Sequence, residues 1–273
     1  MYRSRLFHTR LKLLGTVAIA CGTVLLSAAT TAAGAAAPIM LPDDAYKGRV
    51  TGDVGQKLIP FEAINSDNAA DGGDRLSLPR RIAAAIVAQD KPSPKLIVDV
   101  GAYTGEFLEA FLVQFPKSRG QWTEPVEKNH PTAIRRLARF GKRVDFRIGC
   151  PNRDLSDGCV PAGVDVLITS WLSIHQNLDG ISKYYRQAAA LLPAGGWLAN
   201  LDHVGFAGNA WEQRIQKARV GFHATFEGPP VHHDDFRTPT LAEQLAALHA
   251  AGIDDVEVVW RSFDTVLIMG HKR

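Results

Sequence analysis

The segment LIVDVGAYTG, residues 96–105, constrains the fold of this chain more than any other. Its apolar start is typical of a strand buried on both faces of a sheet, and the residues after it have helical spacing. Gly101 and Gly105 would let the backbone turn tightly and approach a ligand closely. Asp99 is a carboxylate within the strand and needs a hydrogen-bonding partner there. The segment predicts a strand, a ligand-binding turn and a helix; the alternative is a tight turn without a ligand.

A dinucleotide-binding turn fits this segment poorly. The pattern G-x-G-x-x-G would need glycine at positions 101, 103 and 106, where the chain has Gly101, Tyr103 and Glu106. Glu106 would also bring its negative charge beside a pyrophosphate at the helix N-terminus. An NAD(P)-dependent oxidoreductase is therefore the weaker of the cofactor hypotheses.

An acidic residue followed by G-x-G-x-G resembles the first motif of the class I S-adenosylmethionine-dependent methyltransferases. Asp99, Gly101 and Gly105 match this motif, while Tyr103 replaces its middle glycine. The resemblance implies that these four residues contact S-adenosylmethionine. Because of Tyr103, a non-catalytic protein that only binds S-adenosylmethionine is a second alternative.

Three further residues are candidates for cofactor binding. Glu124 ends a predicted second strand, about 20 positions beyond the glycines, where an acidic residue commonly accepts hydrogen bonds from ribose hydroxyls. We expect it to lie at a water-accessible position, so that its removal would cost little stability. The resemblance implies that Asp154, after the third strand, contacts the adenine amino group, and that Ser170 lies in the same site at the end of the fourth strand.

The order of the predicted elements is the second ground for the resemblance, which spans residues 76–273. Five strands alternate with helices, and a helix and a strand pair follow. Pro193, Gly195 and Gly196 join a helix to the fifth strand, as in that family. The final two strands are joined so tightly that they must be antiparallel. We therefore predict an α/β fold with a doubly wound, mostly parallel seven-stranded sheet and a C-terminal antiparallel hairpin.

The resemblance implies an enzyme, a methyltransferase in which an acceptor atom displaces the methyl group of the cofactor directly. A base is needed only if the acceptor must lose a proton. His175, Asp202 and His203 are the candidates, because each is predicted near the sheet edge at which open α/β folds bind ligands. Each histidine could instead have a structural role. Residues 204–239 lie where this family commonly builds its acceptor pocket.

Residues 1–37 have the pattern of a secretory signal. Basic residues precede an apolar run at 13–29, and small residues follow. If it is not cleaved, the segment would be a marginal membrane anchor. We predict an exported protein, periplasmic, secreted or tethered to a membrane, unless translation starts at Met40, in which case the protein would be cytoplasmic. Residues 38–75 are predicted to be an extended segment, which leaves 76–273 as the folded domain.

Charge argues against nucleic acid as a partner. The net charge of the whole chain is +3, but four basic residues and no acidic ones lie in residues 1–37, so the remainder carries about −1. We therefore expect a small-molecule acceptor, no nucleic acid, and membrane contact only through an uncleaved N-terminal segment. The sequence makes no prediction about the oligomeric state.

Two further features involve residues that can bind metals. Cys150 and Cys159 form either one short-loop disulfide, in an oxidising compartment, or two unlinked thiols. Residues 232–235 read His-His-Asp-Asp, but adjacent residues rarely converge on one ion, so we predict a loop and no metal.

Overall fold

The computed structural model describes residues 76–221 and 236–273. The predicted signal, the segment 38–75 and the His-His-Asp-Asp segment at 232–235 lie outside the described residues. Within them, no helix is both long and apolar enough to span a bilayer.

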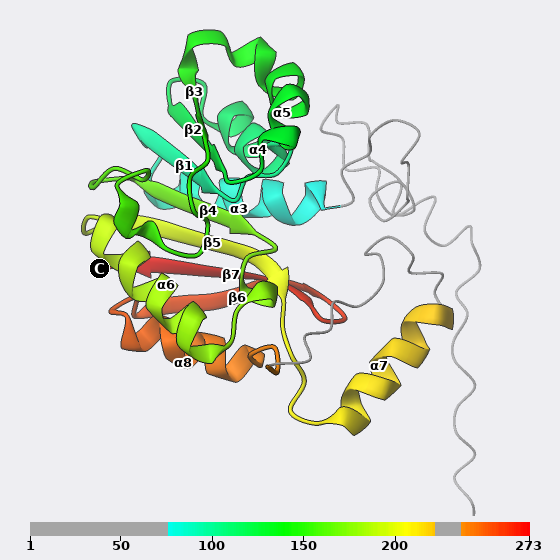
Figure 1. Ribbon diagram of the computed structural model, residues 1–273. Helices are drawn as coiled ribbons and strands as arrows, with labels where there is room; N and C mark the ends of the chain where they lie inside the picture. Colours follow the sequence, from blue (N-terminus) through cyan, green and yellow to red (C-terminus); the bar gives the residue numbers. More distant parts are fainter. Residues whose placement is uncertain (1–75, 222–235) are drawn as a thin grey trace, which may run out of the picture. The chain divides into compact units, whose positions relative to one another are not determined.

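A seven-stranded sheet in the order β3-β2-β1-β4-β5-β7-β6 forms the centre of the domain (Figure 1). Neighbouring strands among β1 to β5 are parallel, and β7 runs antiparallel to both β5 and β6. The predicted fold class and its terminal hairpin are confirmed. The strands are β1 (Leu96–Val100), β2 (Arg119–Glu124), β3 (Val144–Ile148), β4 (Val166–Ser170), β5 (Gly196–His203), β6 (Asp255–Ser262) and β7 (Thr265–Lys272).

Helices cover both faces of this sheet. The α-helices are α3 (Ser77–Asp90), α4 (Glu106–Gln114), α5 (His130–Leu137), α6 (Leu178–Leu191), α7 (Asn209–Gly221) and α8 (Leu241–Ala250). The short 3₁₀ helices are η2 (Glu127–Asn129), η3 (Ala138–Arg143), η4 (Leu155–Asp157) and η5 (Ser173–His175). Helices α3, α4 and α5 pack on one face, and α6 and α8 pack on the other.

Two apolar cores result, one on each face. Ile97 of β1 packs with Phe107 and Phe111 of α4, while the next residue, Val98, packs with Tyr184 of α6 on the opposite face. All five are almost completely buried. A strand with both faces covered must be apolar at nearly every position, which is why β1 is a continuous apolar run broken only by Asp99.

Helix α5 departs from the expected phase. The sequence predicts Ile134, Leu137 and Ala138 on its inner side. Ile134 is 43% exposed and Ala138 is also exposed, while Ala133 is buried beside Leu137. The apolar pair four residues apart, 133 and 137, is the one that faces the sheet. An apolar residue on the solvent side of a helix needs no further cause.

Helix α8 buries a polar residue that its apolar spacing did not predict. Leu248 is buried as expected, but Gln244 is also fully buried. Its Oε1 accepts a hydrogen bond of 2.7 Å from the Tyr185 hydroxyl, which also accepts one of 2.9 Å from the Asn200 amide. This buried network links α8, α6 and β5 and satisfies groups that would otherwise destabilise the core.

A short β-bridge joins the segment that follows β5 to the residue that precedes α8. Gly205 pairs with Thr240 in a parallel β-bridge, and the Gly205 N–H donates to the Pro239 carbonyl at 2.9 Å. The fit is tight, since a Cβ at position 205 would lie 2.0 Å from the Thr238 carbonyl oxygen. The chain segments at 205 and 238–240 therefore lie in direct contact, although many residues separate them.

Candidate functional site

The candidate site lies at one edge of the sheet. Strands β1, β4 and β5 are parallel, so their carboxyl ends share this edge. Thr265 pairs with His203, which brings the turn of the β6–β7 hairpin to the same edge. Ligands of open α/β sheets bind at such an edge, beside the point where the strand order reverses. Here that point lies between β1 and β4.

The predicted glycine turn follows β1 directly. Gly101 has φ +65° and Gly105 has φ +87°, values that favour glycine. Tyr103 has φ +46° although it carries a side chain, and that side chain is 57% exposed. Tyr103 therefore keeps the left-handed backbone that glycine would adopt, at a conformational cost that the surrounding structure must offset.

Asp99 anchors the helix that follows the turn. Its carboxylate is buried and accepts a hydrogen bond of 3.1 Å from the Leu108 N–H in the first turn of α4. Gly105 occupies the N-cap position and has no side chain to offer, so Asp99 supplies a cap from the neighbouring strand. Burial raises the pKa of Asp99 to about 8. The hydrogen bond from Leu108 favours the charged form and acts in the opposite direction, but its effect is smaller.

Glu124 holds the turn itself. One carboxylate oxygen accepts a hydrogen bond of 2.9 Å from the Tyr103 N–H, and the other accepts from the Asn129 amide at 3.2 Å and the Val126 N–H at 3.3 Å. The side chain ends β2 as predicted, but it is only 5% exposed. The expectation of a water-accessible residue is therefore wrong. Glu124 is buried because the glycine turn packs over the end of β2, where the Tyr103 N–H contacts the carboxylate.

Asp154 is engaged in local structure. It caps η4 by accepting from the Ser156 N–H, and it pairs with the Lys183 ammonium at 2.6 Å and the Gln187 amide at 2.7 Å. The hydrogen bond from Lys183 holds the pKa of this exposed carboxyl well below its usual range. These contacts tie the loop after β3 to α6, and a role for Asp154 in cofactor binding stays a prediction.

Ser170 and Trp171 follow the buried part of β4. The Ser170 Oγ is buried and has no hydrogen-bonding partner among residues 76–221 and 236–273. Trp171 has φ +56°, a left-handed conformation that is uncommon for a bulky residue. Its indole packs against the His203 imidazole, with ring centroids 4.5 Å apart. Ser170 ends β4, as predicted, and its role in cofactor binding stays a prediction.

His203 contacts two residues of the β6–β7 hairpin. Its Nδ1 is 3.1 Å from the Thr265 hydroxyl and 3.8 Å from a carboxylate oxygen of Asp264. The ring is largely buried between these residues and Trp171. Such a histidine has a fixed orientation and lies beside an acidic side chain.

Asp202 supports the segment that carries His175. Its buried carboxylate accepts hydrogen bonds from the backbone N–H groups of Ser173, Ile174 and His203. Ser173–His175 form η5, so Asp202 fixes this short helix beside the end of β5. Burial raises the pKa of Asp202 to about 6, while the backbone hydrogen bonds act in the opposite direction. This geometry suits Asp202 to positioning the two histidines.

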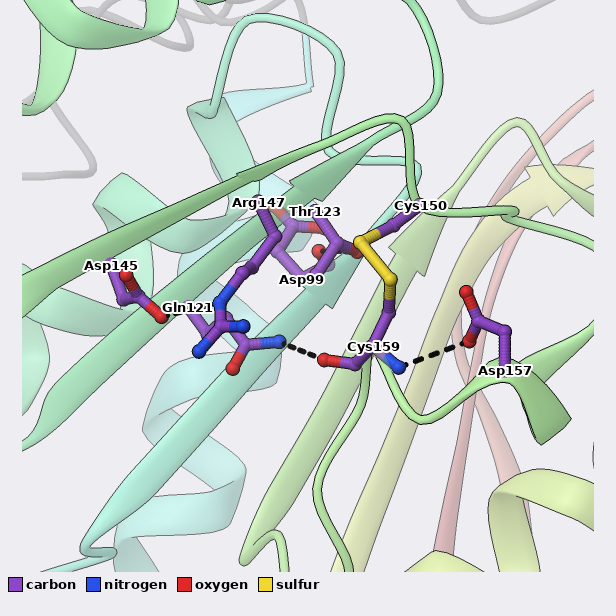
Figure 2. Close-up of a disulfide and its surroundings, with 8 residues drawn as sticks. All are labelled: Asp99, Gln121, Thr123, Asp145, Arg147, Cys150, Asp157 and Cys159. Carbon is purple, nitrogen blue, oxygen red and sulfur yellow. Dashed lines mark hydrogen bonds and ion pairs between the residues drawn. A yellow bond between two sulfur atoms is a disulfide. The ribbon is translucent and has the colours of Figure 1, made fainter.

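A disulfide closes the loop of residues 150–159, which follows β3 and contains η4. Cys150 and Cys159 are bonded, which decides between the two alternatives that the sequence left open (Figure 2). The Gln121 amide donates to the Cys159 carbonyl at 2.7 Å, and the Cys159 N–H donates to Asp157 at 3.0 Å. With Asp157 these cysteines form the sole cluster of potential metal ligands in the described part of the chain, but bonded sulfurs are not thiolate ligands.

Several residues of this edge were not predicted from the sequence. Asn152 lies against the glycine turn, Trp171 and Thr265 contact His203, and Asp264 is near its Nδ1. Only the register of the hairpin brings Thr265 beside His203, and the sequence contains no signal for that register. The positive φ values of Tyr103, Trp171 and Phe263 all fall at this edge, and they account for every non-glycine residue of that kind among the described residues.

No protein-family model matches the sequence, and no curated protein resembles it at a significant level. Solved structures resemble it in fold. An O-methyltransferase family 2 protein from Planctomyces limnophilus, solved in complex with apigenin, is 17% identical with a TM-score of 0.53, over 75% of this chain and 63% of that one. PigF, solved with SAH, is 18% identical with a TM-score of 0.50, over 70% and 55%.

A third similar structure is described as a possible exported protein from Bordetella parapertussis. It is 16% identical with a TM-score of 0.53, over 71% of this chain and 67% of that one. The chain spans less than two thirds of the length of the two methyltransferase-like structures. At these identities the likeness is one of fold, and the fold is that of the class I methyltransferases.

Proposed function

We propose that this protein is an S-adenosylmethionine-dependent methyltransferase that methylates a hydroxyl group of a small molecule. The observation that carries the proposal is the turn after β1, with Gly101 and Gly105 in left-handed conformations beside buried carboxylates, at the ligand-binding edge of a class I methyltransferase fold. The name of the similar Planctomyces protein supports oxygen as the acceptor atom.

The turn suits S-adenosylmethionine better than a dinucleotide. A pyrophosphate binds through free backbone N–H groups and the positive end of a helix. Here the N–H groups of Tyr103, Gly105 and Leu108 already donate within the protein, to Glu124, Ala102 and Asp99. The Glu124 carboxylate also lies against the turn, and its charge would repel a pyrophosphate but not a ligand that carries a sulfonium and an amino group.

The buried Ser170 hydroxyl supports a polar ligand at this edge. A buried hydroxyl without a partner costs free energy, and native proteins leave few of them. A ligand beside the ends of β1 and β4 would satisfy it. The bound cofactor would be held by the turn, by Ser170 and by Glu124, and it would supply a methyl group activated by its sulfonium centre.

The remaining chemistry belongs to the side chains of this chain. They align the acceptor and exclude water, and alignment alone can lower a barrier by roughly 7–11 kcal/mol. A hydroxyl acceptor must lose its proton, and we assign His203 or His175 to take it. The Asp264 carboxylate, 3.8 Å from the His203 Nδ1, would stabilise the resulting charge. Asp202 holds η5 and acts as a positioning residue.

We further propose that the protein is exported. The N-terminal pattern supports this, as does the Cys150–Cys159 disulfide, because disulfides persist mainly in oxidising compartments. The description of the similar Bordetella protein agrees with it. In such a compartment the methyl donor would have to be supplied from the cytosol.

Calorimetric titration tests the cofactor assignment. We expect S-adenosylmethionine and S-adenosylhomocysteine to bind the protein, and NAD not to bind. Binding of NAD without a response to the other two would overturn the proposal. Incubation with methyl-labelled S-adenosylmethionine and a panel of phenols and aliphatic alcohols then tests catalysis. Cofactor binding without transfer to any member of a broad panel would favour the non-catalytic alternative.

A further inference from the structure

Asn152 lies within the disulfide-closed loop and against the glycine turn. A Cβ placed on Gly101 would be 3.2 Å from the Asn152 Nδ2 and 3.3 Å from its Cβ, so the side chain covers the face of Gly101. Asn152 is half-buried, and its carboxamide makes no hydrogen bond to any residue in the described ranges. A polar side chain with unused donors and acceptors therefore lies directly against the glycine turn.

The loop that carries Asn152 is held at its ends. The disulfide joins residues 150 and 159, and Gln121 of β2 donates to the Cys159 carbonyl (Figure 2). On the other side, the Leu155 N–H donates to Gln187 of α6, and Asp154 pairs with Lys183. Pro151 and Asn152 make none of these contacts; Asn152 lies two residues from Cys150 and two from Asp154, so the disulfide is the constraint on its N-terminal side and the Asp154 contacts are the constraint on the other.

We propose that Asn152 is a residue of the methyl-donor site, and that the Cys150–Cys159 disulfide positions it there. This inference rests on the proposed function. The bound donor, lying along the turn at Gly101, accepts or donates a hydrogen bond with the Asn152 carboxamide. Reduction of the disulfide removes the constraint on the Cys150 side of Asn152 while the contacts of Asp154 and Leu155 remain, so that Asn152 must be ordered each time the donor binds, and the affinity for the donor falls.

The reduction step needs an external thiol. A dithiol such as dithiothreitol gives two electrons and two protons to the Cys150–Cys159 bond; the protein gains two thiols, and the reagent becomes its cyclic disulfide. The protein is tested with Cys21→Ser, so that the disulfide cysteines are the only source of thiols. Thiol titration then follows the state of the bond, and thermal melts verify that the reduced protein is still folded.

Titration with S-adenosylhomocysteine measures the effect. We expect reduction to weaken binding about three- to tenfold, and Asn152→Ala to weaken the oxidised protein by a similar factor, since each removes about one hydrogen bond's worth of affinity. Arg153→Gln, an exposed neighbour in the same loop, is the matched control and should bind like the parent protein. Reductant should not change the affinity of the Cys150→Ser, Cys159→Ser protein.

A double-mutant cycle separates positioning from a general loss of structure. If the disulfide acts through Asn152, then Asn152→Ala should have less than about half its effect, as a free energy, when both cysteines are serine. Equal affinity of the oxidised and reduced proteins, or full additivity of the two changes, would overturn the inference while the proposed function stands. If no form binds S-adenosylhomocysteine, the proposed function itself fails.

Discussion

At Asp99, burial and hydrogen bonding act on one carboxyl in opposite directions. Burial has the larger effect and raises the pKa to about 8, although the Leu108 N–H favours the charged form. The folded protein therefore keeps a proton on Asp99 between about pH 4 and 8, while the unfolded chain loses it. Since the unfolded chain binds fewer protons in this window, the contribution of Asp99 to stability falls as the pH rises.

Asp99→Asn should remove this dependence, because the amide is neutral and its oxygen can still accept from Leu108. We expect the difference in melting temperature, variant minus parent, to increase between pH 4 and pH 8. Melts of the ligand-free proteins across this range measure it. Parallel pH profiles would mean that Asp99 is already ionised in the folded state.

Glu124 is a second residue whose burial changes the expected effect of a substitution, here on the stability of the protein. Its three hydrogen bonds hold the turn, so Glu124→Ala should lower the stability of the ligand-free protein by about 1–3 kcal/mol and weaken S-adenosylhomocysteine binding together. Glu124→Gln keeps an acceptor for the Tyr103 N–H and should lose less of both. Unfolding by urea and titration on the two variants check this. A stable Glu124→Ala protein with unchanged affinity would exclude both roles.

At the scale of elements, the bridge between Gly205 and Thr240 depends on a missing side chain. A Cβ at position 205 would meet the Thr238 carbonyl oxygen at 2.0 Å, so Gly205→Ala must displace backbone and should cost about 2–3 kcal/mol. Gly208→Ala is the matched control, because its Cβ would meet no atom within 4 Å. We expect that control to cost under about 1 kcal/mol in the same thermal melts. Equal losses would show that the bridge adds nothing.

Helix α8 begins with a second feature that can be tested. The Thr240 hydroxyl accepts from the Glu243 N–H, and the Glu243 carboxylate accepts from the Thr240 N–H, a reciprocal pair that satisfies two amides of the first turn. Thr240→Ala should cost about 1 kcal/mol, and Thr240→Ser should cost less because the hydroxyl remains. Chemical unfolding of both variants measures the difference. An unaffected Thr240→Ala protein would mean that water replaces the cap.

At the scale of the whole molecule, the sequence predicted the fold well, because β1 and β4 are apolar runs, β3 alternates in polarity, and helical segments separate the first five strands. What it could not predict depends on phase and register. The inner side of α5 was misassigned at Ile134, where two apolar residues competed for one face. Gln244 is buried through partners on α6 and β5, which no local pattern contains.

The residues of the candidate site likewise fall into those that the sequence predicted and those that it missed. The sequence predicted residues at the ends of strands, such as Asp99, Glu124 and His203, since these ends follow from the strand positions. It missed Asn152 and Asp264, which reach the site through a loop and a hairpin turn. It also misjudged the burial of Glu124, since burial depends on how the glycine turn folds over β2.

Export also concerns the whole molecule and stays a prediction. Mass spectrometry of the native N-terminus should find, in material from outside the cytoplasm, either a protein cleaved after the apolar run of residues 13–29 or one that keeps this segment as a membrane tether. A cytosolic protein that starts at Met40 would contradict it. The fold would be unaffected, because none of the described residues lies in that segment.

The Gly205–Thr240 bridge has one more consequence, for how such a protein can diverge. Residues 206–239 leave the sheet and return to it at nearly the same point, so their number can change without moving β5 or α8. Loop closure is tolerant of such changes, since doubling a flexible loop costs only about 0.6 kcal/mol. Descendants of this chain could therefore exchange the whole segment 206–239, by insertion, deletion or recombination at its two joined ends, while the strands that carry the candidate site stay unaltered.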